Sequence, residues 1–220
     1  SKYSSGYQFS SSQNKDCLPG DFSDSDAISM QDAKGYHMDT PFDRYFELRQ
    51  EVVDQLEDMN IDVRYHHHEV GLAGQQEIET ELSVFPRICD SVMIMKDTIR
   101  KVAHEYGLSA TFMPKPIYNE PGNGLHYHIL LRKEGKNVFF EKGRYADLSH
   151  EALYFIGGIL KHGASLTAFT NPSTNSFKRL LPGFEAPVKL FYGLANRSAA
   201  IRIPNYVHTE AGKRIEFRTG

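Results

Sequence analysis

The sequence has few features that would place the protein in a membrane, outside the cell or on nucleic acid. No apolar run approaches the roughly 20 residues of a membrane-spanning helix, and the first residues do not form a signal-peptide pattern. The two cysteines, Cys17 and Cys89, give no disulfide framework, so free thiols in a reducing cytoplasm are expected. The net charge of -3 gives no electrostatic reason to expect nucleic acid. We therefore expect a cytoplasmic protein that binds neither nucleic acid nor a membrane.

Glycine patterns that commonly hold phosphate groups are also missing. The sequence contains no G-x-x-x-x-G-K-[ST] loop, no G-x-G-x-x-G after a predicted strand, and no internal repeat. A nucleotide would therefore have to bind without a glycine cradle. Basic residues do concentrate late in the chain, which indicates a small anionic ligand; they are Arg179, Arg197, Arg202, Lys213, Arg214 and Arg218.

An acidic hairpin is the most informative stretch of the sequence. Apolar and polar residues alternate over 61–65 and again over 77–82, which predicts two half-buried strands, and Gly71 and Gly74 indicate the turn between them. If the hairpin is centred on Ala73, Glu69 and Glu77 lie opposite each other with Cβ atoms roughly 5 Å apart. Such a pair indicates a bound cation or a shared proton. A solvated acidic hairpin is the alternative.

Histidines occur in two groups. His66, His67 and His68 cannot hold one metal together from a strand, because neighbouring side chains point to opposite faces, so we expect them to pack or form hydrogen bonds. A second group follows a turn-rich loop over residues 119–124 and lies in a predicted strand over residues 125–131. His126 and His128 share one face of that strand. They form either a metal or phosphate site or two satisfied surface histidines.

The remaining pattern predicts three helices and several short strands. One helix is expected to start at Thr40-Pro41-Phe42-Asp43 and to end at Asn60. A second covers residues 86–106 and ends at Gly107. A third covers residues 149–170, and its Gly157-Gly158 pair indicates close packing against another element. Strands are expected over 110–113, 188–192 and 199–203. Arg214, Glu216 and Arg218 alternate on one face of a last strand, as an ion-pair ladder or as a site for a metal and anions. Residues 171–187 form a candidate lid.

These elements predict an α+β fold in which a curved antiparallel sheet, a partial barrel, has its helices packed outside. We expect residues 1–33, which are rich in Ser and Asp, to be a flexible segment without chemistry, and residues 34–220 to form the folded part.

Four ordered stretches resemble the catalytic domain of bacterial type I glutamine synthetase. They are His66–Val70 with Gly74–Glu77; Phe112–Pro116 with Gly122–His128; Asn171–Arg179 through Pro182–Pro187; and Asn196–Ser198 through Arg202–Pro204 to Arg214–Arg218. The order and spacing agree from about Lys34 to Gly220. The resemblance implies an ATP-dependent ligase that joins ammonia to glutamate through a γ-glutamyl phosphate, with Mg²⁺ or Mn²⁺ as cofactor and a homo-oligomer, a dodecamer, as the full-length assembly.

The resemblance also implies a role for each matching residue. One divalent cation would be held by Glu69 and Glu77, and a second by His126 and Glu216. Glutamate would be bound by Arg179 and Arg218, which grip its carboxylate, and by Gly122. Phosphate groups would be met by Arg197 and Arg202, and the nucleotide by His128 and Arg214. Glu185 would lie on a flap that closes over the acyl phosphate, and Tyr36 beside the ammonium pocket with Glu69.

The match has gaps, and it leaves rival functions open. The family's Glu-x-Glu strand and small N-terminal domain are missing ahead of residue 1, and the rest of the catalytic domain is missing after Gly220. We therefore expect a fragment of a larger enzyme that is inactive alone. Pro121 and Leu130 replace the family's asparagine and a frequent serine. The rivals are a γ-glutamyl-amine (polyamine) ligase of the same fold and a catalytically inert binding or regulatory relative; a zinc hydrolase is disfavoured because no H-E-x-x-H helix is present.

Overall fold

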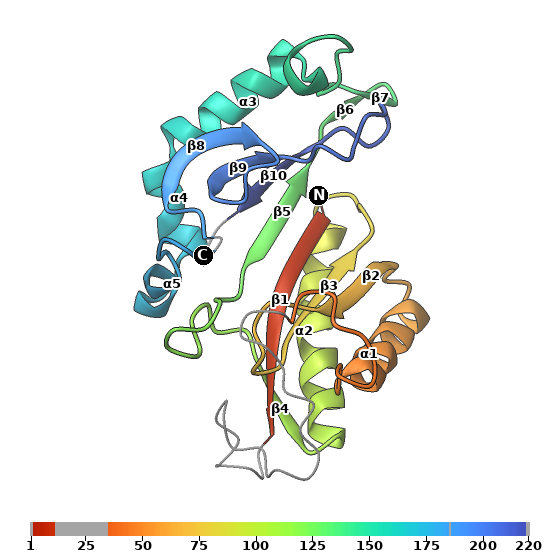
Figure 1. The fold of residues 1–220 in the computed structure, drawn as a ribbon. Coiled ribbons are helices and arrows are strands. Elements are labelled where there is room, and N and C mark those ends of the chain that lie inside the picture. Colours follow the sequence, from red (N-terminus) through yellow and green to blue (C-terminus); the bar gives the residue numbers. More distant parts are fainter. Residues whose placement is uncertain (1, 12–34, 185, 219–220) are drawn as a thin grey trace. The chain divides into compact units, whose positions relative to one another are not determined.

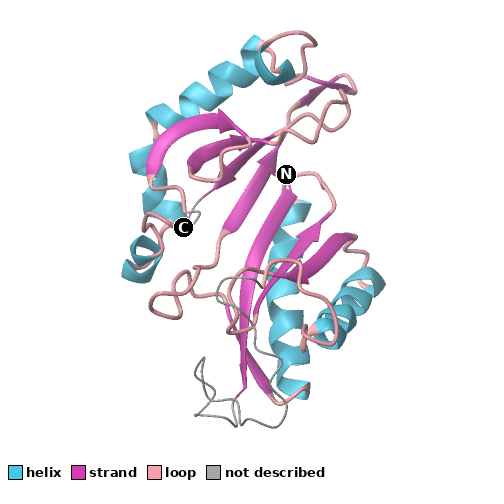
Figure 2. Ribbon diagram, viewed as in Figure 1, coloured by secondary structure: helices cyan, strands magenta, loops and turns pink. Residues whose placement is uncertain are grey.

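The computed structural model describes residues 2–11, 35–184 and 186–218, which fall into two compact units (Figure 1). We call residues 4–123 the N-terminal unit, and residues 1–3 with 124–220 the C-terminal unit. Both contain helices and strands, which confirms the α+β class (Figure 2). Among the described residues, no helix is long and apolar enough to cross a membrane.

The N-terminal unit is built on four strands: β1 (Lys2–Ser11), β2 (Val63–His68), β3 (Gln75–Thr80) and β4 (Leu108–Thr111). β3 pairs with β2 on one side and β1 on the other, β4 also pairs with β1, and all three pairings are antiparallel. β1 falls within the segment that we expected to be flexible, and residues 1 and 12–33 of that segment lie outside the described residues.

Two helices cover this sheet, α1 (Phe46–Asp58) and α2 (Arg87–Glu105). Their apolar stripes meet in one core with Ile78 from β3; its members include Leu48, Val52, Leu56, Met95, Ile99 and Val102, each at most 1% exposed. Burying each such side chain contributes roughly 1.5–3 kcal/mol. This core holds β3, the strand that carries Glu77, firmly against the two helices.

The two helix predictions differ in accuracy. α2 ends as expected, at Gly107 in the left-handed conformation (φ +70°). α1 begins at Phe46 rather than near Thr40, because Asp43 does not serve as part of a capping box. Its carboxylate instead accepts hydrogen bonds from the Arg49 guanidinium and from the Tyr45 backbone N–H. A contact between residues six apart thus replaces the local cap that the sequence pattern indicated.

The C-terminal unit has a four-stranded sheet and a separate short hairpin. The sheet order is β5 (Leu125–Ile129), β10 (Ile215–Arg218), β9 (Ala199–Ile203) and β8 (Lys189–Leu194), and the hairpin is β6 (Arg132–Lys133) with β7 (Lys136–Asn137). β10 is antiparallel to both neighbours, whereas β8 runs parallel to β9. We expected only antiparallel pairs, so this edge departs from the prediction.

Helical segments cover the C-terminal sheet: η1 (Tyr145–Asp147), α3 (His150–Lys161), α4 (Gly163–Thr170) and α5 (Thr174–Lys178). The core contains Phe139, Leu148, Ala152, Ile156, Ile201, Ile203 and Ile215. Ser149 caps α3 as a helix start should, but the single helix expected over 149–170 is broken at His162. α4 starts with Gly163, where an added Cβ would lie 2.8 Å from a Leu190 methyl group.

The glycine pair of α3 and the candidate lid over residues 171–187 also belong to this unit. The Gly157-Gly158 pair does not mark close packing, since an added Cβ would meet nothing within 4 Å at either position. The candidate lid contains the short helix α5, with Ser173 accepting a hydrogen bond from the Ser176 N–H.

Candidate functional site

The acidic pair lies at the turn end of the β2–β3 hairpin in the N-terminal unit. His67 is opposite Glu77, and the Glu69 N–H donates to the Gln75 carbonyl over 2.8 Å. Glu69 is therefore opposite Gln75, and the predicted register was wrong by two residues. Because both glutamates still lie on the same face as diagonal neighbours, their side chains remain within reach of each other.

The two carboxyl groups of the pair interact strongly. Burial, followed by the charge of Glu77 and a hydrogen bond to it, raises the pKa of Glu69 to about 7. The Val70 N–H donates to the Glu69 carboxylate and opposes part of this rise. The pair thus has the chemistry that was predicted for it, namely a shared proton or a place for a cation.

Aromatic side chains line the pair. The His67 Nε2 lies 3.8 Å from a Glu77 carboxylate oxygen, and the His67 ring stacks on His37 with 4.1 Å between centroids. The Tyr36 ring meets the His67 ring edge-on with 5.2 Å between their centroids; its place beside an ammonium pocket stays a prediction. His66 and His68 form hydrogen bonds with Arg49 and with the Glu69 carbonyl, in agreement with the predicted packing roles.

A buried amide network, which we did not predict, connects this hairpin to the glycine loop. The Gln75 amide nitrogen donates to the Gly122 carbonyl and to Asn123 Oδ1, each over 3.0 Å, while its oxygen accepts from the Gly71 N–H. Asn123 in turn donates to the Met113 carbonyl. Gly122, a predicted glutamate contact, is therefore held against the turn that carries Glu69. Gln75 lies in the Gly74–Glu77 stretch that carries the resemblance, but nothing in that stretch indicated a bridge to the glycine loop.

A buried arginine, also missed, holds the other side of β3. The Arg49 guanidinium donates to Asp43, Gln76 and the His66 ring, and Arg49 is only 2% exposed. Arg49 thereby ties α1 to both strands next to Glu77. Its spacing from Asp43 could have indicated an ion pair, but its bond to Gln76 depends on the folded sheet.

In the C-terminal unit, β5 and β10 bring a second group of predicted residues together. His126 is opposite Arg218 and His128 is opposite Glu216. The His126 Nδ1 lies 3.2 Å from a Glu216 oxygen, and burial, followed by the charge of Arg218, lowers the pKa of His126 to about 3. His126 is therefore neutral, and we assign the Nδ1 proton as the donor to Glu216.

Glu216 is a buried, ionised carboxylate surrounded by cations. Burial alone would raise its pKa, but the hydrogen bond from His126 and the charge of Arg218 hold the pKa well below its usual range. Arg218 donates to one Glu216 oxygen over 2.8 Å, and Arg202 forms an ion pair with the other oxygen. Of the alternating residues 214, 216 and 218, Glu216 thus pairs with Arg218 and with Arg202 of the neighbouring strand, whereas the Arg214 guanidinium donates elsewhere.

Arg179 joins this cluster from the end of α5. Its guanidinium lies 3.4 Å from the His126 Nε2, and burial together with the charge of Arg218 lowers the pKa of Arg179 to about 10. Gly124 makes the approach possible, because a Cβ there would overlap both the Arg179 guanidinium and the His126 ring. Two buried guanidinium groups that repel each other are well suited to an added carboxylate.

The predicted nucleotide contacts also meet. The Arg214 Nε donates to the His128 Nδ1 over 3.0 Å, and the same guanidinium reaches the Tyr206 hydroxyl and the Gly212 carbonyl. Burial lowers the pKa of His128 well below its usual value, so its ring is neutral. Arg197 lies in the turn before β9. Glu185 lies outside the described residues.

The residues differ in how well they fit a metal ion. Carboxylate oxygens such as those of Glu69 and Glu77 suit Mg²⁺ or Mn²⁺, and a cation would relieve the repulsion that raises the pKa of Glu69. His126 and Glu216 are suitable ligand types, but arginines already neutralise Glu216. Within residues 35–184 and 186–218, no three His, Cys, Asp or Glu side chains gather as a potential metal site.

Comparison with known proteins identifies the family. Residues 5–220 match the family model described as glutamine synthetase, catalytic domain. A glutamine synthetase of Pseudomonas taetrolens is 52% identical over 184 residues, which are 84% of this chain and 39% of the relative. A protein of Cupriavidus pinatubonensis named 3-hydroxylaminophenol mutase has the same identity and coverage. Glutamine synthetase of Plasmodium falciparum superimposes with a TM-score of 0.86 at 33% identity, over 99% of this chain and 47% of that one.

The match to the family model begins at residue 5, so it extends into the segment that we had set apart from the folded part. The chain spans about two fifths of the length of the curated relatives named here. With matches to the family model over nearly its whole length and to curated members at about half identity, the chain belongs to the glutamine synthetase catalytic-domain family.

Proposed function

We propose that this chain contributes to an enzyme that makes glutamine from glutamate, ammonium and ATP. The observation that carries the proposal is the clustering of Arg179, Arg218, His126 and Glu216, within a chain 52% identical to a glutamine synthetase. Arg218 pairs with Glu216, but the charge of Arg218 still lowers the pKa of the neighbouring Arg179, and an added carboxylate would relieve that repulsion.

Each unit would supply a different part of the chemistry. In the N-terminal unit, Glu69 and Glu77 would hold a divalent cation, and Glu69 with Tyr36 would receive the ammonium ion. A carboxylate is a poor electrophile, so glutamate must first be phosphorylated on its side chain, and divalent cations supply charge neutralisation on the transferring phosphoryl group. The raised pKa of Glu69 suits a group that takes a proton from ammonium.

The C-terminal unit would supply the anion contacts. Arg179 and Arg218 offer planar forks for the carboxylate of glutamate, while Arg202 and Arg197 would meet phosphate oxygens. His126 and Glu216 would hold a second cation, which would have to replace contacts that Glu216 now makes with Arg202 and Arg218. His128 and Arg214 would contact the nucleotide, and Glu185 would belong to a flap that excludes water from the acyl phosphate.

A chimeric enzyme tests this proposal. The matching 184-residue segment of the Pseudomonas taetrolens glutamine synthetase would be replaced by that of this chain, and the assembled protein assayed for glutamine formation. We expect glutamine formation that requires ATP, ammonium and glutamate together. An assembled chimera that forms no glutamine would refute the proposal.

The same assay separates the rival ligase. Ammonium would be replaced by methylamine and by putrescine at equal concentration, with the parent enzyme as the reference. We expect ammonium to be preferred, because Tyr36 and the aromatic rings around His67 crowd the space beside Glu69. A chimera that prefers either amine would instead support a γ-glutamyl-amine ligase.

A further inference from the structure

A pocket in the N-terminal unit lies apart from the residues discussed above. It has a volume of about 350 Å³ and is lined by the chain before β2, the end of β3 and the start of α2. Strand alternation puts the Thr80 side chain on the opposite face of β3 from Glu77 and Glu79. None of the residues proposed for glutamine synthesis lines the pocket.

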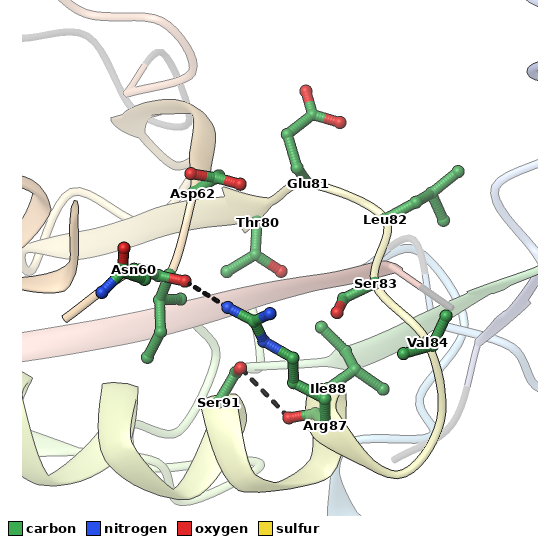
Figure 3. A pocket seen from close by; sticks show the side chains of 11 residues that line it. Asn60, Asp62, Thr80, Glu81, Leu82, Ser83, Val84, Arg87, Ile88 and Ser91 are labelled. Atoms are coloured by element: carbon green, nitrogen blue, oxygen red, sulfur yellow. Dashed lines mark hydrogen bonds between the residues drawn. The ribbon is translucent and has the colours of Figure 1, made fainter.

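Thr80 is the unusual residue of the pocket wall. It is 2% exposed, and no described residue gives its hydroxyl oxygen a hydrogen-bond partner. A buried hydroxyl without a hydrogen-bond partner destabilises a fold. Figure 3 shows the Thr80 oxygen on the side that faces Ser83, above the Arg87 guanidinium. The hydroxyl is thus placed where a molecule in the pocket could satisfy it.

Positive charge adjoins this hydroxyl from two sources. One Arg87 nitrogen donates to the Asn60 carbonyl over 2.9 Å, which leaves the rest of the guanidinium's donor capacity for a ligand (Figure 3). The pocket also lies at the N-terminus of the 19-residue helix α2, which no side chain caps. The positive end of a helix dipole favours an anion at this position.

The acidic residues of the pocket limit which anions fit. Asp62 and Glu81 are exposed at its rim, and Figure 3 shows the Glu81 side chain extending away from Thr80 and Arg87. Their repulsion is screened by solvent and salt but disfavours a large polyanion. We propose that this pocket binds a small oxyanion, a carboxylate or a phosphate group, through Arg87, the Thr80 hydroxyl and the start of α2.

The test is calorimetric titration of the 220-residue chain with sodium acetate and, separately, with sodium phosphate, each at constant ionic strength set with chloride. We expect saturable binding of at least one anion, and the stronger of the two identifies the group. Arg87→Gln and Thr80→Val should each weaken that binding about tenfold or more, because each removes a hydrogen bond to a charged group. Without the anion, Thr80→Val should melt no lower than the wild type, because it removes an unsatisfied hydroxyl.

The matched control is Arg132→Gln. Arg132 is also an exposed arginine that donates one hydrogen bond to a backbone carbonyl, that of Ala211, but it lies in the C-terminal unit. Its substitution should leave the binding unchanged. Thr80→Ser keeps the hydroxyl and should retain binding. It is the test of Thr80 if the Thr80→Val variant does not fold. The proposal would be overturned if neither anion showed saturable binding, or if Arg132→Gln weakened binding as much as Arg87→Gln does. Unchanged binding in Arg87→Gln or in Thr80→Val would also overturn it.

Discussion

At the scale of single residues, the Glu69 carboxyl group shows most clearly how the fold sets chemistry. Its partner Glu77 is eight residues away in sequence and would be unremarkable in a solvated chain. Burial in the hairpin and the charge of Glu77 together raise the pKa of Glu69 to about 7. A carboxyl group that exchanges its proton near neutral pH can serve both cation binding and proton transfer.

The raised pKa predicts a pH dependence of stability. Without a bound metal, the folded chain holds the Glu69 proton more tightly than the unfolded chain does, so Glu69 contributes most to stability below pH about 4.5. That contribution is lost as the pH rises to about 7. Urea unfolding midpoints of wild type and Glu69→Gln between pH 4.5 and 8 measure it: the wild type should lose stability relative to the variant. A constant difference across this range would show that the pKa of Glu69 is not raised.

Arg218 allows a second prediction at this scale. In the chimeric enzyme, Arg218→Leu should weaken glutamate use by at least about 30-fold, which corresponds to roughly 2 kcal/mol for one charge-assisted contact. The KM for ATP should change much less. Arg144→Leu is the matched control, because Arg144 also pairs with a glutamate, Glu141, but at the surface. An unchanged KM for glutamate in Arg218→Leu would exclude a carboxylate role.

At the scale of secondary-structure elements, Gln75 links two segments that local patterns treat as separate. Its amide group bridges the hairpin turn at Gly71 and the glycine loop at Gly122 and Asn123. All its hydrogen-bonding atoms are used within the buried network, so the two segments are held together by one side chain. Whatever the Glu69 turn binds should therefore depend on the position of the glycine loop.

Gln75→Glu tests this link with almost no change in shape. The variant puts a carboxylate oxygen where the amide nitrogen donated to two oxygen acceptors. We expect this to lower the free energy of unfolding by about 2–3 kcal/mol. Backbone amides of residues 114–124 should also exchange with solvent faster. Gln50→Glu is the control, because Gln50 donates to Asp54 at the exposed surface of α1 and should change stability little. Equal effects of the two variants would mean that Gln75 has no bridging role.

Elements defined by contacts between residues close in sequence were predicted more accurately than those defined by contacts between distant segments. α2 was predicted well because Pro86 and Gly107 mark its ends locally. The start of α1, the hairpin register and the parallel β8–β9 pair were not, because each depends on contacts between separate elements. The same holds for the candidate site. Its charged residues were predicted from their motifs, whereas the contacts that Gln75 and Arg49 make with other segments depend on the folded sheet.

At the scale of the whole molecule, the proposal gives each cation few ligands from the part of the chain that the structure describes. Each inferred metal has two side chains, Glu69 with Glu77 and His126 with Glu216, whereas such ions take about six donors. The chain is also about two fifths as long as its curated relatives. Loosely held ions and an active site open to water should make the reaction inefficient.

We therefore predict that the 220-residue chain alone makes at least about a hundredfold less glutamine than a complete relative, since a displacement of roughly 1 Å between reacting groups can have that effect. The measurement compares glutamine formation by this chain and by the Pseudomonas taetrolens enzyme under the same conditions. Comparable turnover would show that the two ligands for each cation are sufficient.

The most direct test of the account is whether the Glu69–Glu77 pair binds a divalent cation, because this distinguishes a catalytic chain from an inert relative. The measurement is the melting temperature of the 220-residue chain with and without millimolar Mn²⁺, for wild type and for Glu77→Gln. We predict that Mn²⁺ raises the melting temperature of the wild type, because it relieves the repulsion between the carboxylates, and that Glu77→Gln abolishes the gain. An equal gain in Glu77→Gln, or no gain in the wild type, would contradict the account.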